Sequence, residues 1–418
     1  MGSLVKYEVK KIVSRRVTQV ALAVILVLLA AVSLLNVSSQ YALDPQHINV
    51  EFEGTQAIAQ QKADAQALSG PITDEKATEL LRELQSYIGE DGEIKPEYRW
   101  ENPVKTEDME SYWQFHAANG KYLSLIVGPW SQGYEMPVTV ASRIDTSQTV
   151  DLYGQARAKV EAGLSGASAT FDYSDAEREF WQAKAAEVKT PVEYGYAGGW
   201  SDFMDMSQFL LFALLAMVIA CAGAFNVEYR DKTDAVLLST RLGKSKLSIA
   251  KAVAAIMVAT VAYLLATAVV LGVPLLLFGS DGAGLPLQVR SLSNTYGLSI
   301  GQACAAVCLI GYAIMLGLLG LVLALSSKMR SQMGILAIAA AVVLLPMFVP
   351  QLQSSLANHV VYLFPYFALD PANLFGIVSY QVGPVVVEYP VVLAVLYLLE
   401  FAAGIAFAVR SFSRHQVA

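Results

Sequence analysis

One short segment between two apolar stretches combines charged residues with an apolar patch. This segment, residues 226–251, carries Glu228, Arg230 and Lys244 around an apolar patch at 236–238. Such a charged helical elbow, broken by a glycine, can insert into a groove on a soluble partner. An ordinary basic loop held by anionic lipid headgroups has the same residue pattern. The residues alone therefore leave both interpretations open.

One acidic residue, Glu400, lies at the centre of the apolar stretch 391–409. A charged side chain at the middle of a bilayer costs roughly 3 kcal/mol on insertion scales. No Lys or Arg lies within an apolar stretch to pair with it. We expect the carboxyl group to face other helices, either as a protonated structural group or as a proton or cation site, and both roles stay open.

The sequence contains only weak indications of a nucleotide site, a metal site or a catalytic nucleophile. Residues 243–245 read Gly-Lys-Ser, but a P-loop needs a further glycine at position 238, which holds leucine, and a preceding strand. His47 and His116 have no cysteine or spaced carboxylate motif beside them, so no metal site is predicted. The three cysteines lie in apolar stretches, which excludes a disulfide-stapled secreted domain and a Cys-based zinc site. No catalytic signature is present, so a membrane enzyme is disfavoured.

The composition predicts an α-helical membrane protein. The chain has 418 residues, of which 55% are apolar and 16% charged, whereas soluble domains carry about 25% charged residues. Its mean hydropathy is +0.45. A spanning helix needs roughly 20 apolar residues. Six stretches meet or approach that length: 17–35, 209–225, 252–278, 303–325, 333–350 and 391–409. The first is longer than the apolar core of a typical signal peptide, so we interpret it as a retained span.

The basic residues predict the orientation. Outside residues 37–205, 15 of the 16 Lys and Arg residues fall on one side of the six-span model, with Arg290 as the exception. Because basic residues accumulate on the cytoplasmic side, both termini are predicted to be cytoplasmic. Residues 1–36 then form the N-terminus and span one, residues 37–205 an extracytoplasmic domain, and residues 206–418 spans two to six.

The segment 37–205 is predicted to be a mainly helical domain, with 28 acidic and 13 basic residues. Helix starts are indicated at Thr73, at Thr106 and at the capping-box pattern 174–177. Residues 122–127 are expected to form a short strand. All five tryptophans of the chain lie in this segment. They are predicted to build its core, with a ligand-facing surface as the alternative.

Special residues in the apolar stretches predict how the helices pack. Pro274 and Pro346 are expected to kink spans three and five. Gly311, Gly317 and Gly320 in span four indicate close helix contacts. The cysteines at 304 and 308 are interpreted as small packing residues rather than as a redox pair.

The elbow resembles the cytoplasmic elbow of ABC-2-type transporter permeases. In that family a glutamate at the end of span two precedes an arginine, a Gly-Thr pair, a leucine-rich stretch, a Ser/Thr turn with a basic residue and a lysine that enters span three. The corresponding places here hold Glu228, Arg230, Thr233, Leu237, Leu238, Ser239, Lys244 and Lys251. Lys232 replaces the usual glycine, so the local turn differs. The loop 351–390, with its Pro-containing stretch 363–371, is similar to the family's last outer loop, which dips back into the membrane.

The resemblance implies the permease subunit of an exporter with a large domain between spans one and two. Two copies of a separate ATP-binding subunit would hold ATP and Mg and would dock on the elbow. A second permease copy or a paralogue would complete a dimer in a plasma membrane, and the external domain without disulfides suits a bacterial one. No cofactor in this chain and no nucleic-acid partner are expected. The alternative is a mechanotransmission or sensor protein whose outer domain moves while nothing crosses the bilayer. The residues do not identify the substrate.

Overall fold

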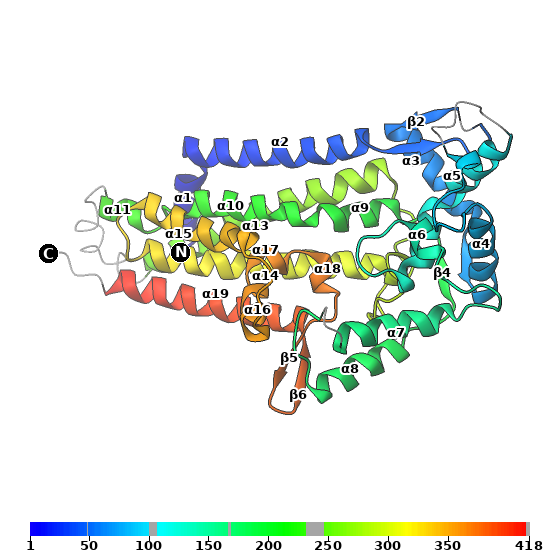
Figure 1. The fold of residues 1–418 in the computed structure, drawn as a ribbon. Helices are drawn as coiled ribbons and strands as arrows, with labels where there is room; N and C mark the ends of the chain where they lie inside the picture. Colours follow the sequence, from blue (N-terminus) through cyan, green and yellow to red (C-terminus); the bar gives the residue numbers. More distant parts are fainter. Residues whose placement is uncertain (48, 100–106, 166–168, 231–245, 415–418) are drawn as a thin grey trace.

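Long apolar helices form one bundle in this computed structural model, which describes residues 1–47, 49–99, 107–165, 169–230 and 246–414 (Figure 1). Within these ranges, five helices are long and apolar enough to cross a membrane. They are α2 Arg16–Ser38, the run Gly198–Glu228, α13 Lys246–Leu277, α14 Ile300–Ser326 and α19 Tyr389–Ser413. The run Gly198–Glu228 contains α9 Gly198–Met206, η3 Ser207–Phe209, α10 Leu210–Cys221 and the first residues of α11 Asn226–Arg230.

The predicted span 333–350 forms a shorter helix than expected. Helix α15 covers Gln332–Leu344 and continues as the 3₁₀ helix η5, Leu345–Phe348. At 1.5 Å per residue, α15 is about 20 Å long, less than the roughly 30 Å of a hydrocarbon core. The α-helix ends just before Pro346, because proline lacks an N–H and its ring clashes with the preceding turn. The six-span count therefore stays a prediction.

Short elements connect α15 to the last long helix. Three short helices, α16 Ser355–Tyr362, α17 Pro365–Ala368 and α18 Pro371–Leu374, precede the hairpin of β5 Ser379–Val382 and β6 Val385–Glu388. Helix α17 contacts both α15 and η5. The helices lie beside the bundle, as the prediction of a membrane-dipping loop requires, although their depth in a bilayer stays a prediction (Figure 1).

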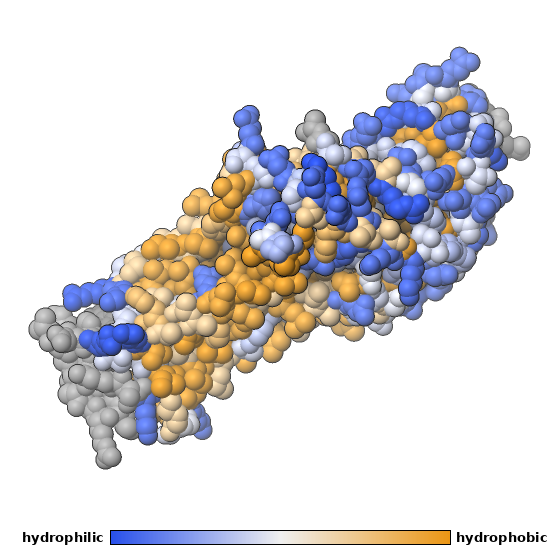
Figure 2. All heavy atoms as spheres, turned by 90° about the horizontal axis from the view of Figure 1, so that it is seen from below, coloured by the Kyte–Doolittle hydropathy of each residue, from blue (hydrophilic) through white to orange (hydrophobic). Residues whose placement is uncertain are grey.

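Helix α1, Gly2–Val13, and the last turn of α19 lie at the same end of the bundle (Figure 1). A domain of shorter helices occupies the opposite end. Figure 2 shows hydrophobic residues covering the middle of the molecule and mainly hydrophilic residues covering this domain. This surface pattern suits a bundle surrounded by lipid with a solvated domain beyond it.

The domain at the far end is mainly helical, as predicted. Its helices are α3 Gly54–Ala67, α4 Asp74–Ser86, α5 Glu107–Val127, α6 Pro137–Ala141, α7 Leu152–Ser165 and α8 Asp175–Ala186. Two antiparallel pairs join them: β1 Tyr41–Leu43 with β2 Glu51–Glu53, and β3 Gly70–Ile72 with β4 Val192–Tyr194.

Two predicted helix starts are confirmed by their caps, and the predicted strand is wrong. The Thr73 side chain accepts a hydrogen bond from the Lys76 amide, and Ser174 forms a reciprocal capping box with Glu177. Thr106 lies outside the described residues, although α5 begins directly after it. Residues 122–127 belong to α5 and not to a strand. A short apolar run fits either element, and burial against the domain's core decided for the helix.

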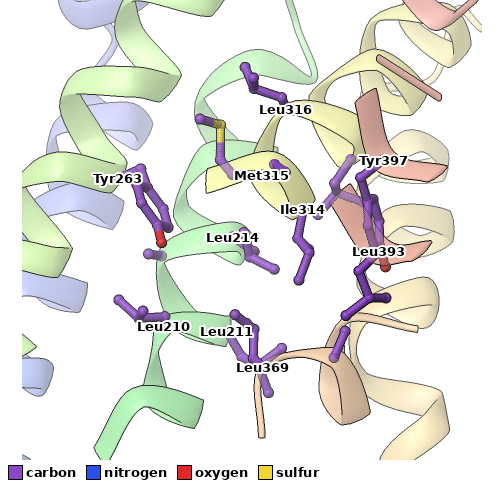
Figure 3. Packing of buried hydrophobic residues seen from close by; sticks show 14 of the residues in the cluster. Leu210, Leu211, Leu214, Tyr263, Ile314, Met315, Leu316, Leu369, Leu393 and Tyr397 are labelled. Atoms are coloured by element: carbon purple, nitrogen blue, oxygen red, sulfur yellow. The ribbon is translucent and has the colours of Figure 1, made fainter. Parts of the chain in front are cut away.

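The bundle core is continuous with part of the domain. Leucines of α10 belong to one buried cluster with Tyr263 of α13, Ile314 of α14 and Tyr397 of α19 (Figure 3). Trp181 of α8 is fully buried in the same cluster, and its indole N–H donates to Ser379 Oγ at 3.1 Å. Trp113 and Trp130 are partly buried against the domain's core, as predicted, whereas Trp200 is partly buried against the bundle cluster. The tryptophan at position 100 lies outside the described residues.

Helices α14 and α19 approach each other through glycines, which confirms the predicted close packing. A Cβ on Gly404 would lie 2.4 Å from backbone atoms of Gly320, and one on Gly317 would lie 2.5 Å from the Tyr397 ring. A Cβ on Gly311 would lie 2.4 Å from the Tyr263 hydroxyl. The cysteines are free thiols. Helix α13 runs through its internal proline at position 274 to its end at Leu277, and a kink there stays a prediction.

Candidate functional site

A buried lysine joins the two ends of the elbow. Lys251, in the second turn of α13, is 1% exposed. Its ammonium group donates hydrogen bonds to Glu228 Oε1 at 2.6 Å, to Glu8 Oε2 at 3.0 Å and to the Ala224 carbonyl oxygen at 3.0 Å. An ammonium group has three protons, so all three are used. The contact unites α1, the α10–α11 region and α13 at one point.

A second lysine completes the cluster. Lys11 Nζ donates to the same Glu228 oxygen at 2.5 Å. Burial disfavours the charge on Lys11, but the hydrogen bond and attraction from Glu228 outweigh this, so the pKa of Lys11 is raised above its ordinary value. The cluster of Glu8, Lys11, Glu228 and Lys251 thus contains two acids and two bases. Because buried charges need close partners, removing one member leaves the others uncompensated.

The sequence of α1 explains how it reaches the cluster. Glu8, Lys11 and Ile12 are three and four residues apart, so they share one face of the helix. Glu8 and Ile12 are buried, whereas Lys6 and Lys10 are exposed. The amphipathic pattern therefore places α1 across the base of the bundle.

A serine of α14 forms hydrogen bonds with the backbone between the end of α10 and the start of α11. Ser326 Oγ accepts hydrogen bonds from the amides of Phe225 and Asn226, at 3.0 and 3.2 Å, and donates to the Ala222 carbonyl at 2.8 Å. Phe225 also packs against Phe412 at the end of α19. These contacts connect the charge cluster to the ends of α14 and α19.

The structure brings together Glu228 and Lys251, which the family pattern had named separately. Of Arg230, the last residue of α11, only the backbone is described. The remaining predicted elbow residues lie outside the described residues: Thr233, Leu237, Leu238, Ser239 and Lys244. Their role as a docking surface stays a prediction.

Sequence reasoning missed Glu8 and Lys11. A signal was present, because Glu8 is the single acidic residue in a basic N-terminal segment and lies in helical register with Ile12. The second Glu228 oxygen, Oε2, is buried and has no hydrogen-bond partner among the described residues.

Glu400 lies elsewhere, along the contact between α19 and α14. It is half-buried, and its Oε2 is 3.1 Å from the position that a Cβ on Gly317 would take. Within the described part of the chain, its carboxyl group has no hydrogen-bond or ion-pair partner. The expected position facing another helix is therefore present, and its role stays a prediction.

Comparison with known proteins agrees with this architecture. A family model described as ABC-2 family transporter protein matches residues 3–416. Comparisons with curated proteins and with solved structures each found no match. The family match includes α1, the charge cluster, the elbow and Glu400. The chain therefore belongs to the ABC-2 transporter family, as a multi-pass membrane protein and a permease subunit of an ABC transporter.

Proposed function

We propose that this chain is the permease subunit of an ATP-driven exporter in a plasma membrane, and that an ATP-binding subunit docks on the elbow, residues 226–251. Two ATP-binding subunits would serve two permease chains, either two copies of this chain or this chain and a paralogue. ATP and Mg would be bound by those partners. The elbow end of the bundle would then be cytoplasmic, and the helical domain would lie outside.

The buried pair of Glu228 and Lys251 supports this proposal most directly. The pair joins α11, at the beginning of the elbow, to the first turns of α13, at its end. A force applied to the elbow would reach α11 and α13 together, because separating buried charges is costly. Glu8 extends the connection to α1. A partner that pushes on the elbow would thus move three helices as one unit.

The proposal is tested with the full chain purified in detergent from its native host. We expect an ATPase subunit to co-purify and to hydrolyse ATP. Leu238→Asp places a charge in the elbow's apolar patch and should abolish co-purification. Tyr134→Asp is the matched control, because Tyr134 is fully exposed in the domain at the other end.

Lys251→Gln separates docking from coupling. The substitution changes no residue of the elbow's apolar patch, 236–238, but removes the charge that joins the elbow's ends. We expect the ATPase to remain bound while its hydrolysis no longer responds to the permease. If the wild-type chain purifies without an ATPase and Leu238→Asp behaves as wild type, the exporter proposal is wrong.

A further inference from the structure

A large cleft lies where the helical domain meets the bundle. Its volume is about 940 Å³. Its walls come from the end of α2, from β1, α3 and α5, and from α9 with Phe278, which directly follows α13. Pockets for small organic ligands usually measure about 300–1,000 Å³. The cleft is therefore large enough for a drug-sized molecule, and its lining residues come from segments far apart in the sequence.

The cleft is acidic. Glu51, Asp64, Asp202 and Asp205 line it, against one lysine, Lys121. Asp205 is neutralised by Arg290, whose guanidinium lies 2.5 Å from its carboxylate. Lys121 donates to the Gln61 side chain at 2.7 Å. Burial lowers the pKa of this lysine, and the negative charges of the nearby aspartates oppose the shift.

Asp202 carries an unused acceptor. The residue is 8% exposed, and one carboxylate oxygen accepts a hydrogen bond from the Asn36 amide. The other oxygen, Oδ2, is buried and has no partner among the described residues. A buried acceptor without a partner is costly, and a donor on a bound ligand would remove that cost.

Aromatic side chains form another part of the wall. Trp113, Tyr122, Tyr194 and Tyr196 line the cleft, and the rings of Tyr122 and Tyr194 are 4.6 Å apart. His116 stands beside Trp113, with ring centroids 5.7 Å apart. Burial lowers the pKa of His116, so the imidazole is uncharged near neutral pH and does not repel a cation. Aromatic faces attract cations and bury apolar groups.

We propose that this cleft binds an organic cation, with an ammonium group at Asp202 Oδ2 and an apolar body against the aromatic wall. A bare metal ion fits less well, because no group of three or more His, Cys, Asp or Glu side chains in the described ranges is placed to hold one. The inference goes beyond the proposed function. Binding here needs no ATPase, so its failure and that of the elbow proposal are distinguishable.

The test uses the full-length chain in lipid nanodiscs without ATP. The probe is dansylcadaverine, a fluorescent primary amine, and its N-acetylated derivative is the uncharged control. Energy transfer from protein tryptophan reports binding, and empty nanodiscs report partition into lipid. We expect saturable binding of the amine and at least roughly tenfold weaker binding of the acetylated probe, as for the loss of a hydrogen bond to a charged group.

The variant Asp202→Asn tests whether the ammonium group contacts the Asp202 carboxylate. It keeps the size of the side chain, and we expect it to weaken binding of the amine by a similar factor while leaving the acetylated probe unchanged. Asp172→Asn is the matched control, because Asp172 is exposed and does not line the cleft. Equal binding of the two probes to the wild-type chain would overturn the proposal, and this comparison needs no variant to fold. Wild-type affinity in a folded Asp202→Asn protein would overturn it as well.

Discussion

Lys251 and Glu228 form a buried ion pair, with 2.6 Å between Nζ and Oε1, across the base of the elbow. The two residues are 23 positions apart, near the two ends of the segment that resembles the family's coupling elbow. Glu8 of α1 contacts the same lysine at 3.0 Å. The pair is thus the point at which three helices of the permease meet.

Removal of this lysine should destabilise the protein strongly. Lys251→Met leaves Glu228 and Glu8 buried with a single compensating charge, and breaking a buried pair in this way costs about 3–5 kcal/mol. Lys11→Met should cost less, because the Lys11 side chain is 28% exposed and Glu228 keeps Lys251 as a partner. Thermal unfolding of the purified chain compares the two variants. Equal midpoints would contradict a central role for Lys251.

Simultaneous removal of both charges should restore part of that stability. Glu228→Gln combined with Lys251→Met leaves one acid, Glu8, and one base, Lys11, in the cluster, so the double variant should be more stable than Lys251→Met alone. The single variant Glu228→Gln completes a double-mutant cycle, which gives the coupling energy between the two residues. If the two substitutions change the free energy of unfolding additively, the residues do not act as a pair.

Packing of α14 against α19 should not tolerate a methyl group at Gly404. A Cβ there meets backbone atoms of Gly320 at 2.4 Å, and backbone cannot move aside as a side chain can. We expect Gly404→Ala to cost about 1–3 kcal/mol, the usual range for overpacking. Gly272→Ala is the control in α13, where a Cβ has no neighbour within 4 Å. That substitution should be neutral or stabilise by up to about 1 kcal/mol. Similar unfolding midpoints for both variants would argue against this helix contact.

The stability of the helical domain should depend on pH through His116. Burial lowers the pKa of this imidazole below its ordinary value of 6.5. Well above pH 6.5 the group is neutral in both the folded and the unfolded chain, so it does not change the free energy of unfolding there. As the pH falls below 6.5, the unfolded chain takes up the proton first, and stability decreases. Thermal unfolding between pH 7.5 and 5.5 should show a smaller decrease for His116→Gln than for wild type. If the unfolding midpoints of wild type and His116→Gln fall equally with pH, the pKa of His116 is the same in the folded and the unfolded chain.

Glu400→Gln should leave the fold intact, because the carboxyl group has no described partner to lose. The substitution should also abolish any step that depends on a proton or cation at this position. ATP hydrolysis by the purified complex, measured across pH and sodium concentration, reports such a step. An unchanged dependence would leave Glu400 with a structural role only, and a large loss of thermal stability would point to partners that the monomer lacks.

The sequence by itself determined the features that depend on neighbouring residues. The apolar stretches predict the long helices because spanning length and composition are local properties. Thr73 and Ser174 predict helix starts because their side chains cap amides three residues ahead. The elbow's charges and leucines are contiguous, so the family resemblance was visible without a structure.

Only the tertiary structure decided which distant residues meet. Residues 122–127 form helix because the domain's core covers them, and a short apolar run cannot distinguish helix from strand. Glu8 and Lys251 are 243 positions apart, and their contact depends on how α1 crosses the bundle. The cleft around Asp202 likewise combines segments from both ends of the helical domain with the bundle. Such contacts arise from packing between elements, which local residue patterns do not encode.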